Sequence, residues 1–231
     1  YFGFCEALGI NKRISRWDIP VPEEADNKAA EWIPSGQPTL LLSPCSSHSV
    51  RNWTVTGYAA VARYAAEYHG MQVLITGGGS VLEAQLGEAI AENLSGLTSV
   101  YNLVGRTDLK TLLALMSRSS VVLAPDSGPV HMAMAVGTPT IGLFAETNPD
   151  RAAPVLAREW VVNAYPRAIE KAFGREVAEV RWGRRIAKPW AMDLIKSSEV
   201  IDTLDRLIAT PAQERLAPGV EWAYRKPYAA E

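Results

Sequence analysis

The chain has 231 residues, which suits one large domain that folds unaided but is short for two full domains. Its 23 Lys and Arg against 25 Asp and Glu give a nearly balanced charge, which argues against a polyanion such as a nucleic acid as the main partner. Two cysteines without metal-binding spacing favour a reducing, cytoplasmic setting, and no apolar run approaches the roughly 20 residues of a membrane-spanning helix, so we expect at most a peripheral membrane association.

The first part of the chain, residues 1–38, has a mixed character. A short helical pattern ends at Gly9, and a stretch rich in proline and acidic residues leads to a helix that ends near Trp32. This mixture predicts a linker with peripheral helices that enters a domain. The chain starts at Tyr1 without a methionine or a secretory signal, so we expect that it begins inside a longer protein.

From Thr39 onward, short apolar runs alternate with amphipathic segments, which is typical of strand–helix units on a parallel sheet. The apolar runs are continuous because both faces of such strands are covered. The predicted strands are residues 39–43, 71–76, 100–104, 120–125 and 140–144, and the predicted helices are 55–69, 81–94, 108–117, 130–136 and 198–208. The pattern therefore predicts an α/β, Rossmann-like, doubly wound parallel sheet over residues 39–208, followed by a polar tail over 209–231.

The loop after the fourth predicted strand is the most informative. Asp126, Ser127 and Gly128 lead directly into a helix, where Ser127 is suited to cap and Gly128 lets a ligand approach the backbone. The amides and dipole of that helix terminus are suited to a phosphate, although an ordinary strand-to-helix turn has the same pattern. His131, one turn on, is either a phosphate donor or a core histidine. Asp126 suits a sugar hydroxyl or the turn itself, because a carboxylate repels phosphate.

Two further loops follow predicted strands. SPCSSHSVRNW, residues 43–53, offers the hydroxyls of Ser46 and Ser47 and the guanidinium of Arg51, which either pairs with a diphosphate or is a solvated surface charge. TGGGSVLE, residues 76–83, is glycine-rich but does not match a dinucleotide fingerprint. Glu83 there either compensates the helix dipole or contacts a ribose or base.

Other features predict no metal and no cofactor. The chain has three histidines, none in metal-ligand spacing, and no phosphate-loop, zinc-protease or nucleophile-elbow motif. The stretch RWGRRIAKPW, residues 181–190, is basic and aromatic. It is either a solvated surface with aromatic packing or a contact for an anionic acceptor or a membrane surface.

Taken together, these loops resemble a known family. DSGPVHMAMAVGTPTIGLFAETNPDRAAP, SPCSSHSVRNW and LITGGGSVLEAQLGEAI occur in the order seen in glycosyltransferase family nine, the heptosyltransferases of lipopolysaccharide core biosynthesis. The resemblance extends over roughly residues 1–208 and is weakest at 155–190. It implies a GT-B architecture of two Rossmann-like domains, of which this chain is the C-terminal, donor-binding one.

The resemblance also implies roles for individual residues. Ser46 and Ser47 would contact the diphosphate of a nucleotide-sugar donor, ADP-heptose by implication, and Arg51 would neutralise it. Glu83 would lie near the ribose or adenine, and Asp126 would hold hydroxyls of the sugar. Three residues, Ser127, Gly128 and His131, would complete the phosphate site.

Transfer in this family is inverting and independent of metal, and it joins the sugar to a lipid-linked acceptor bound by the N-terminal domain. The family's general base lies in that domain, so no catalytic residue is identified in this chain. Arg51 stands where many members have lysine, and Ala145 where many have glycine. We expect a cytoplasmic location, with the inner face of the cytoplasmic membrane as an alternative. Two other interpretations remain: a non-catalytic nucleotide-sugar-binding module, and a protein similar to nucleotide-sugar epimerases.

Overall fold

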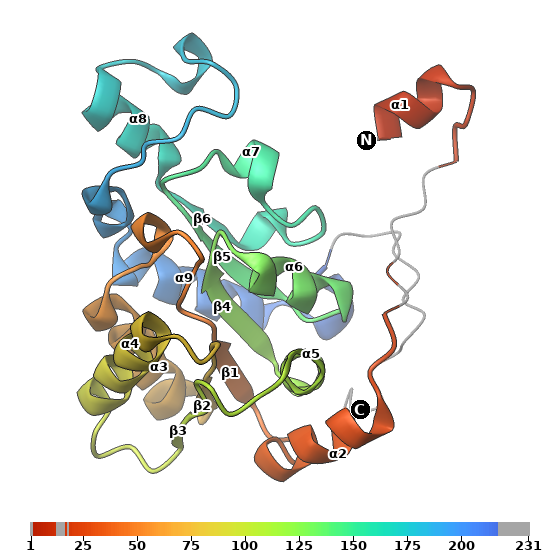
Figure 1. Ribbon diagram of the computed structural model, residues 1–231, viewed down its shortest axis with the longest axis vertical. Helices are drawn as coiled ribbons and strands as arrows, with labels where there is room; N and C mark the ends of the chain where they lie inside the picture. The colour runs from red at the N-terminus through yellow and green to blue at the C-terminus, as the bar shows by residue number, and fades with distance from the viewer. Residues whose placement is uncertain (1, 13–16, 18, 217–231) are drawn as a thin grey trace.

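The computed structural model describes residues 2–12, 17 and 19–216. Six parallel strands form one sheet in the order β3-β2-β1-β4-β5-β6, with helices on both faces (Figure 1). The predicted α/β doubly wound fold is confirmed. The strands are β1 Thr39–Leu42, β2 Gln72–Ile75, β3 Val100–Asn102, β4 Val121–Pro125, β5 Thr140–Phe144 and β6 Val161–Asn163. The last of these was not predicted, because three residues are too few for an apolar pattern to stand out.

The centre of the sheet is the pair formed by β1 and β4. Leu40 of β1 lies opposite Val73 of β2 on one side and opposite Val121 of β4 on the other. From β1 the chain proceeds outward to β2 and β3, and then returns to place β4 on the other side of β1. After the carboxyl ends of β1 and β4, the chain therefore continues to helices on opposite faces of the sheet. In open sheets of this kind, ligands bind between the loops at such a position.

One face of the sheet is covered by α3 (Val55–His69), α4 (Val81–Asn93), α8 (Tyr165–Phe173) and α9 (Ser197–Ala209). Helix α3 has the predicted bounds because both of its ends are specified locally. The Thr54 side chain accepts a hydrogen bond from the Gly57 amide, and Gly70 ends the helix in the left-handed conformation. Its buried face packs into a core that includes Trp53, Tyr58, Ile90, Tyr165 and Leu204.

The other face is covered by α2 (Glu23–Trp32), α5 (Leu109–Arg118) and α6 (Gly128–Ala135). Asp108 caps α5 by accepting the Thr111 amide at 2.7 Å. Although α2 belongs to the predicted peripheral segment, its Ala25 and Ala29 are buried in the second core. Arg118 of α5 donates two hydrogen bonds of 2.8 Å to Asp26 of α2. These contacts make α2 part of the folded unit.

The shorter elements lie around this unit. Helix α1 (Phe2–Ala7) stands apart from the sheet in Figure 1, and α7 (Pro149–Ala152) follows β5. The short 3₁₀-helices of the described residues are Ser49–Arg51, Arg158–Trp160, Val177–Glu179, Pro189–Leu194 and Ala212–Glu214. Of the predicted tail 209–231, the part from 217 onward lies outside the described residues. Among the described residues, no helix combines the length and apolar character that crossing a membrane requires.

Candidate functional site

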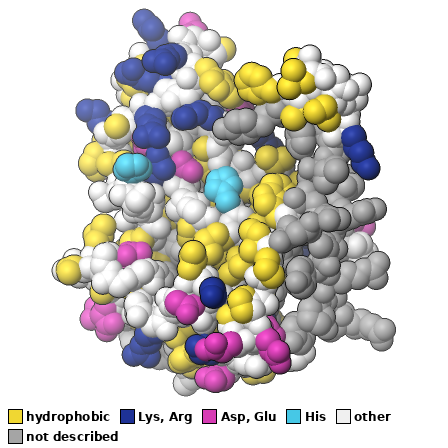
Figure 2. Space-filling view, turned by 45° about the vertical axis from the view of Figure 1, so that its right-hand side comes forward, with side chains coloured by type: hydrophobic (Ala, Val, Ile, Leu, Met, Phe, Trp, Pro, Cys, Tyr) yellow, Lys and Arg dark blue, Asp and Glu magenta, His cyan; other side chains and the backbone are white. Residues whose placement is uncertain are grey.

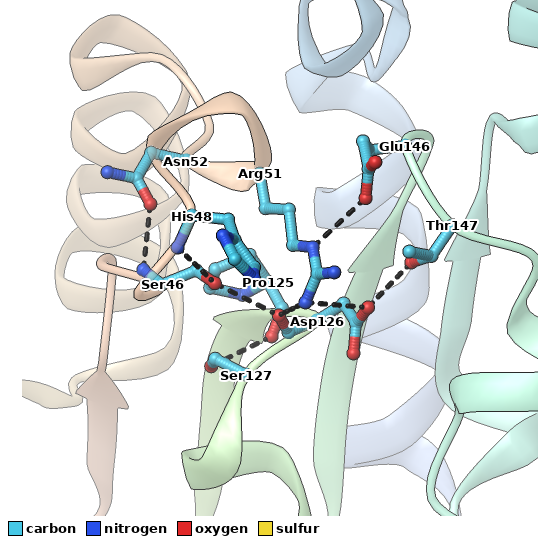
Figure 3. Close-up of polar contacts among 9 residues, drawn as sticks. All are labelled: Ser46, His48, Arg51, Asn52, Pro125, Asp126, Ser127, Glu146 and Thr147. Atoms are coloured by element: carbon cyan, nitrogen blue, oxygen red, sulfur yellow. Dashed lines mark hydrogen bonds and ion pairs between the residues drawn. The ribbon is translucent and has the colours of Figure 1, made fainter. Parts of the chain in front are cut away.

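Three loops meet at the carboxyl ends of β1, β4 and β5 (Figure 3). The loop after β1 brings Ser46 and Arg51, the loop after β4 brings Asp126 and Ser127, and the loop after β5 brings Glu146 and Thr147. The arginine points from the first loop toward the other two in Figure 3. Residues from distant parts of the sequence are therefore joined in one polar network.

Arg51 is the centre of this network. Its Nε donates to Glu146 Oε2 at 3.0 Å, and its Nη1 lies 3.3 Å from Asp126 Oδ2. The same Nη1 donates to the main-chain oxygen of Asp126 at 3.4 Å. The exposed fractions of the three side chains are 12%, 3% and 13% for arginine, glutamate and aspartate respectively. Arg51 is therefore a largely buried, paired cation, and its interpretation as a solvated surface charge is wrong.

Ser46 ties the first loop to the second. Its Oγ donates to the main-chain oxygen of Asp126 at 3.3 Å, and its amide donates to Asn52 Oδ1 at 2.7 Å. The side chain is buried, whereas the adjacent Ser47 is exposed on the same loop. The two serines thus differ: one holds the loops together and the other faces solvent.

Asp126 is held by more than the arginine. Thr147 Oγ1 donates to Asp126 Oδ2 at 2.7 Å, which fixes the carboxylate at the end of β4. Sequence reasoning did not single out Thr147 or Glu146. Both follow β5 directly, so the rule that selected the residues after β1 and β4 also applied to them.

The N-terminus of α6 is open. Ser127 occupies the N-cap position, but its hydroxyl donates back to the Pro125 oxygen at 3.1 Å, and no side-chain hydrogen bond caps the helix. The prediction that Ser127 caps α6 through its hydroxyl is therefore wrong. The helix begins two residues before the predicted 130, with Gly128 and Pro129 in its first turn, and a Cβ added at Gly128 would meet no atom within 4 Å. This leaves first-turn amides and the positive end of the helix dipole directed at the loops.

His131 lies on α6 and is exposed, so its interpretation as a core histidine is wrong. Partial enclosure lowers the pKa of His131, and the nearby Asp126 carboxylate opposes that shift. Its imidazole is therefore neutral near pH 7. In that state it has one N–H to donate.

Glu83 is engaged within its own glycine-rich loop. Its carboxylate accepts the Gly78 amide at 2.7 Å and the Ser80 hydroxyl at 2.5 Å, which completes a capping box at the start of α4. Burial raises the pKa of Glu83, but the hydrogen bonds from Ser80 and Gly78 outweigh it, so the net shift is downward. The observed contacts agree with the helix-terminus interpretation, and the contact with ribose or adenine stays a prediction.

The glycine-rich loop nevertheless lies beside the first loop. Burial, and secondly the negative charge of Glu83, raise the pKa of the Cys45 thiol to about 11. Because β1 and β2 are paired in parallel, with Leu42 opposite Ile75, the loops that follow them start side by side. The predicted site residues are thus distributed along the carboxyl edge from β2 to β5.

An open cleft of about 900 Å³ lies over α6 and α7. It contains Arg51, Asp126 and His131 of the predicted residues, whereas the others do not line it, namely Ser46, Ser47, Glu83, Ser127 and Gly128. Its lining is Trp17, Ile19, Arg51, Asp126, His131, Met132, Met134, Ala135, Thr147, Asp150, Arg151, Ala152, Ala153, Val155, Trp182 and Arg185. Within the described part of the chain, no group of three or more His, Cys, Asp or Glu side chains has an arrangement that could hold a metal ion.

Comparison with solved structures supports the fold. A glycosyltransferase of family 9 from Veillonella parvula superposes with a TM-score of 0.69 at 20% identity, over 89% of this chain and 58% of its own. The ADP-heptose heptosyltransferase II of Escherichia coli gives a TM-score of 0.58 at 20% identity, over 81% of this chain and 52% of its own. These neighbours establish the GT-B type of Rossmann-like domain.

Sequence comparison identifies the family. The chain is 34% identical over 207 residues to the lipopolysaccharide core heptosyltransferase OpsX of Haemophilus influenzae, covering 90% of the chain and 59% of that relative. It is 28% identical to a lipooligosaccharide heptosyltransferase 2 of Campylobacter jejuni, over 67% of the chain and 48% of the relative. The chain thus spans about half the length of these relatives. Since the model of glycosyltransferase family 9 (heptosyltransferase) matches residues 2–182, the chain belongs to glycosyltransferase family 9.

Proposed function

We propose that this chain is the donor-binding half of a heptosyltransferase-like glycosyltransferase and that its donor is ADP-heptose. The observation that carries the proposal is that Arg51 donates to Asp126, the residue just before the open N-terminus of α6, and lines one cleft with His131 of that helix. A diphosphate is the part of a nucleotide sugar that such a pair of positive groups suits best. Solved structures of the Escherichia coli heptosyltransferase WaaC contain ADP and ADP-2-deoxy-2-fluoro heptose, which supports this choice of donor.

In the proposed complex, the positive groups bind the diphosphate. Arg51 neutralises it, the hydroxyls of Ser46 and Ser47 donate to it, and the Gly128 amide and the His131 imidazole at the start of α6 complete the site. Ser127 lies at the same helix terminus. The diphosphate takes over part of the hydrogen bonding that Arg51 now gives to Glu146 and Asp126.

The remaining contacts concern the sugar and the nucleoside. Asp126, fixed by Thr147, accepts hydrogen bonds from sugar hydroxyls, because its carboxylate would repel a phosphate. Glu83 lies on the side of the ribose and adenine. This division places the negative side chains on the uncharged parts of the donor.

The chemistry that we propose is an inverting displacement at the anomeric carbon without a metal ion. An acceptor hydroxyl attacks, the bond to the ADP oxygen breaks, and the leaving diphosphate gains negative charge. Preorganised positive groups stabilise that charge as it develops. The general base belongs to the other half of the enzyme, which holds the lipid-linked body of the lipopolysaccharide core acceptor at the inner face of the cytoplasmic membrane.

The experiment that tests this proposal is calorimetric titration of the chain with ADP and with UDP, without divalent metal and at two salt concentrations. We expect saturable binding with a preference for ADP, weakened by salt because the contacts are ionic. A preference for UDP would redirect the function toward other donors or an epimerase. Binding of neither nucleotide would overturn the assignment of a donor site to this chain.

A further inference from the structure

Three side chains that the donor site does not use line another part of the cleft. Arg151 comes from α7, whereas Trp182 and Arg185 come from the segment between α8 and the 3₁₀-helix Pro189–Leu194. The sequence singled out the second segment as basic and aromatic. We call these three residues the basic wall.

The basic wall is held in place by contacts to the rest of the fold. A Cβ added at Gly183, which has a φ of +74°, would lie only 3.1 Å from Cδ of Arg151, so the arginine packs against that glycine. The Ile186 amide donates to the main-chain oxygen of Glu146 at 3.0 Å. In addition, the Tyr165 hydroxyl donates to the Arg184 oxygen at 2.7 Å. The wall is therefore anchored next to the end of β5.

The charges of the cleft are balanced everywhere except at this wall. Arg51 is paired with Glu146 and Asp126, and Asp150 has Arg158 as its ionic partner at 3.8 Å. In the part of the chain that the structure describes, neither Arg151 nor Arg185 has an ion pair. Both are exposed, and Figure 2 shows Lys and Arg side chains gathered in the upper part of the molecule. The cleft thus has two unneutralised guanidinium groups beside the donor site.

From this arrangement we propose that the basic wall binds an anionic group, a phosphate or a carboxylate, on the sugar of the acceptor. The proposal rests on the donor site described above, because it makes the wall the place where the acceptor meets the donor. Guanidinium groups bind such oxyanions through paired hydrogen bonds. The Trp182 indole, with an exposed fraction of 65%, offers an apolar face to the sugar ring.

The shape of the site favours a small anionic sugar over a membrane surface. Arg151 and Arg185 line the same open cleft as Asp126, so an anion bound by them would lie beside the donor site. A lipid surface would contact a protruding face of the protein. Arg185 lies beyond residue 182, where the family match ends, whereas Arg151 and Trp182 lie within the match.

The test is titration of the chain with mannose 6-phosphate in the presence of saturating ADP, with unphosphorylated mannose as the uncharged probe. We expect saturable binding of the sugar phosphate only. Arg151→Gln and Arg185→Gln should each weaken it about tenfold, the scale of one charge-assisted contact. Arg175→Gln is the matched control, because Arg175 is exposed outside the cleft and its loss should change nothing.

The outcomes separate this proposal from the donor site. If ADP binds but the sugar phosphate does not, the donor site stands and the acceptor role of the wall is refuted. If the two substitutions weaken ADP binding, the wall serves the donor diphosphate instead. Sedimentation with anionic phospholipid vesicles that depends on Arg185, without sugar phosphate binding, would assign the wall to a membrane surface. If ADP itself fails to bind, the sugar phosphate titration without nucleotide still measures the wall.

Discussion

Arg51 lies between two carboxylates, and this determines what a bound diphosphate has to replace. Glu146 accepts from its Nε and Asp126 lies beside its Nη1. A guanidinium has five N–H donors, so a ligand can share it with one carboxylate while displacing the other. The network of the free protein therefore preorganises the arginine and also competes with the donor.

The first prediction concerns Arg51 itself. Arg51→Ala should weaken ADP binding by about 1 to 3 kcal/mol, because it removes a charge-assisted contact to the diphosphate. Calorimetric titration measures the change. Arg63→Ala serves as control, since Arg63 is a half-exposed surface arginine of α3 that pairs with Glu67. Unchanged affinity in Arg51→Ala would remove this residue from the donor site.

The second prediction has the opposite sign. Glu146→Gln should strengthen ADP binding by about 1 kcal/mol, or roughly fivefold, because a neutral amide neither repels the diphosphate nor holds Arg51 by charge. Titration of Glu67→Gln, an exposed glutamate of α3, controls for the change in net charge. Weaker binding in Glu146→Gln would mean that the carboxylate supports the donor site instead of competing with it.

The sequence indicated the residues of the first two loops but not the partners that bind them. Arg51, Ser46 and Asp126 follow predicted strands and have side chains that suit a nucleotide sugar. Glu146 follows a strand equally closely. Its contact with Arg51, however, joins two residues that are 95 positions apart along the chain, so it depends on the tertiary structure. No local pattern encodes that pairing. The Ser127 hydroxyl was mispredicted for a different reason, because it donates to the Pro125 oxygen two residues before it and accepts no amide of α6.

At the scale of elements, α6 determines where an anion can bind. The helix begins with Gly128 and Pro129, and Pro129 has no amide to donate. Because Ser127 turns its hydroxyl back to the strand, the remaining first-turn amides have no side-chain cap. A helix terminus in this state gains most from an external acceptor.

This yields a third prediction, on Gly128. Gly128→Ala should leave the free energy of unfolding unchanged or raise it slightly, because a Cβ there meets no atom within 4 Å in the free protein. It should weaken ADP binding about tenfold, since a methyl group would lie where the ligand approaches the backbone. Chemical denaturation and titration measure the two quantities. Gly3→Ala in α1, also without a neighbour within 4 Å, is the control, and equal ADP affinity in both variants would place the diphosphate elsewhere.

Most elements could be predicted because their ends are specified by nearby residues. The bounds of α3 follow from Thr54 and Gly70, and the start of α5 follows from Asp108. The structure places β6 at the edge of the sheet, where only Val162 of its three residues is buried. Such a strand forms because its main chain pairs with β5, and its three residues do not by themselves specify an extended conformation.

At the scale of the whole molecule, the folded unit includes more than the predicted domain of residues 39–208. Helix α2 covers one face of the sheet, with Ile33 at its end also buried in the second core. Asp26 holds the helix to Arg118, whose side chain has an exposed fraction of only 6%. The boundary at residue 39 stays a prediction, but α2 is an integral part of the packing on that face.

The fourth prediction tests this role of α2. Asp26→Ala should lower the free energy of unfolding by about 1 to 3 kcal/mol, because it leaves a buried guanidinium without its carboxylate. Urea denaturation measures the loss, and ADP affinity should be unchanged because the pair lies far from the loops of the donor site. Asn27→Ala, at an exposed position of the same helix, should have little effect. Equal stability of the two variants would show that α2 contributes through its apolar side chains alone.

The strand order also has a consequence for how the protein folds. Strands β1 and β4 are neighbours at the centre of the sheet, but the contact between Ser46 and Asp126 at their ends joins residues 80 apart in sequence. Such non-local contacts require closure of a long loop, which makes folding slow. Contacts that form after the transition state affect the rate of unfolding more than the rate of folding. A nucleotide that bridges the two loops would therefore slow unfolding, and so prolong the lifetime of the native state, without making folding faster.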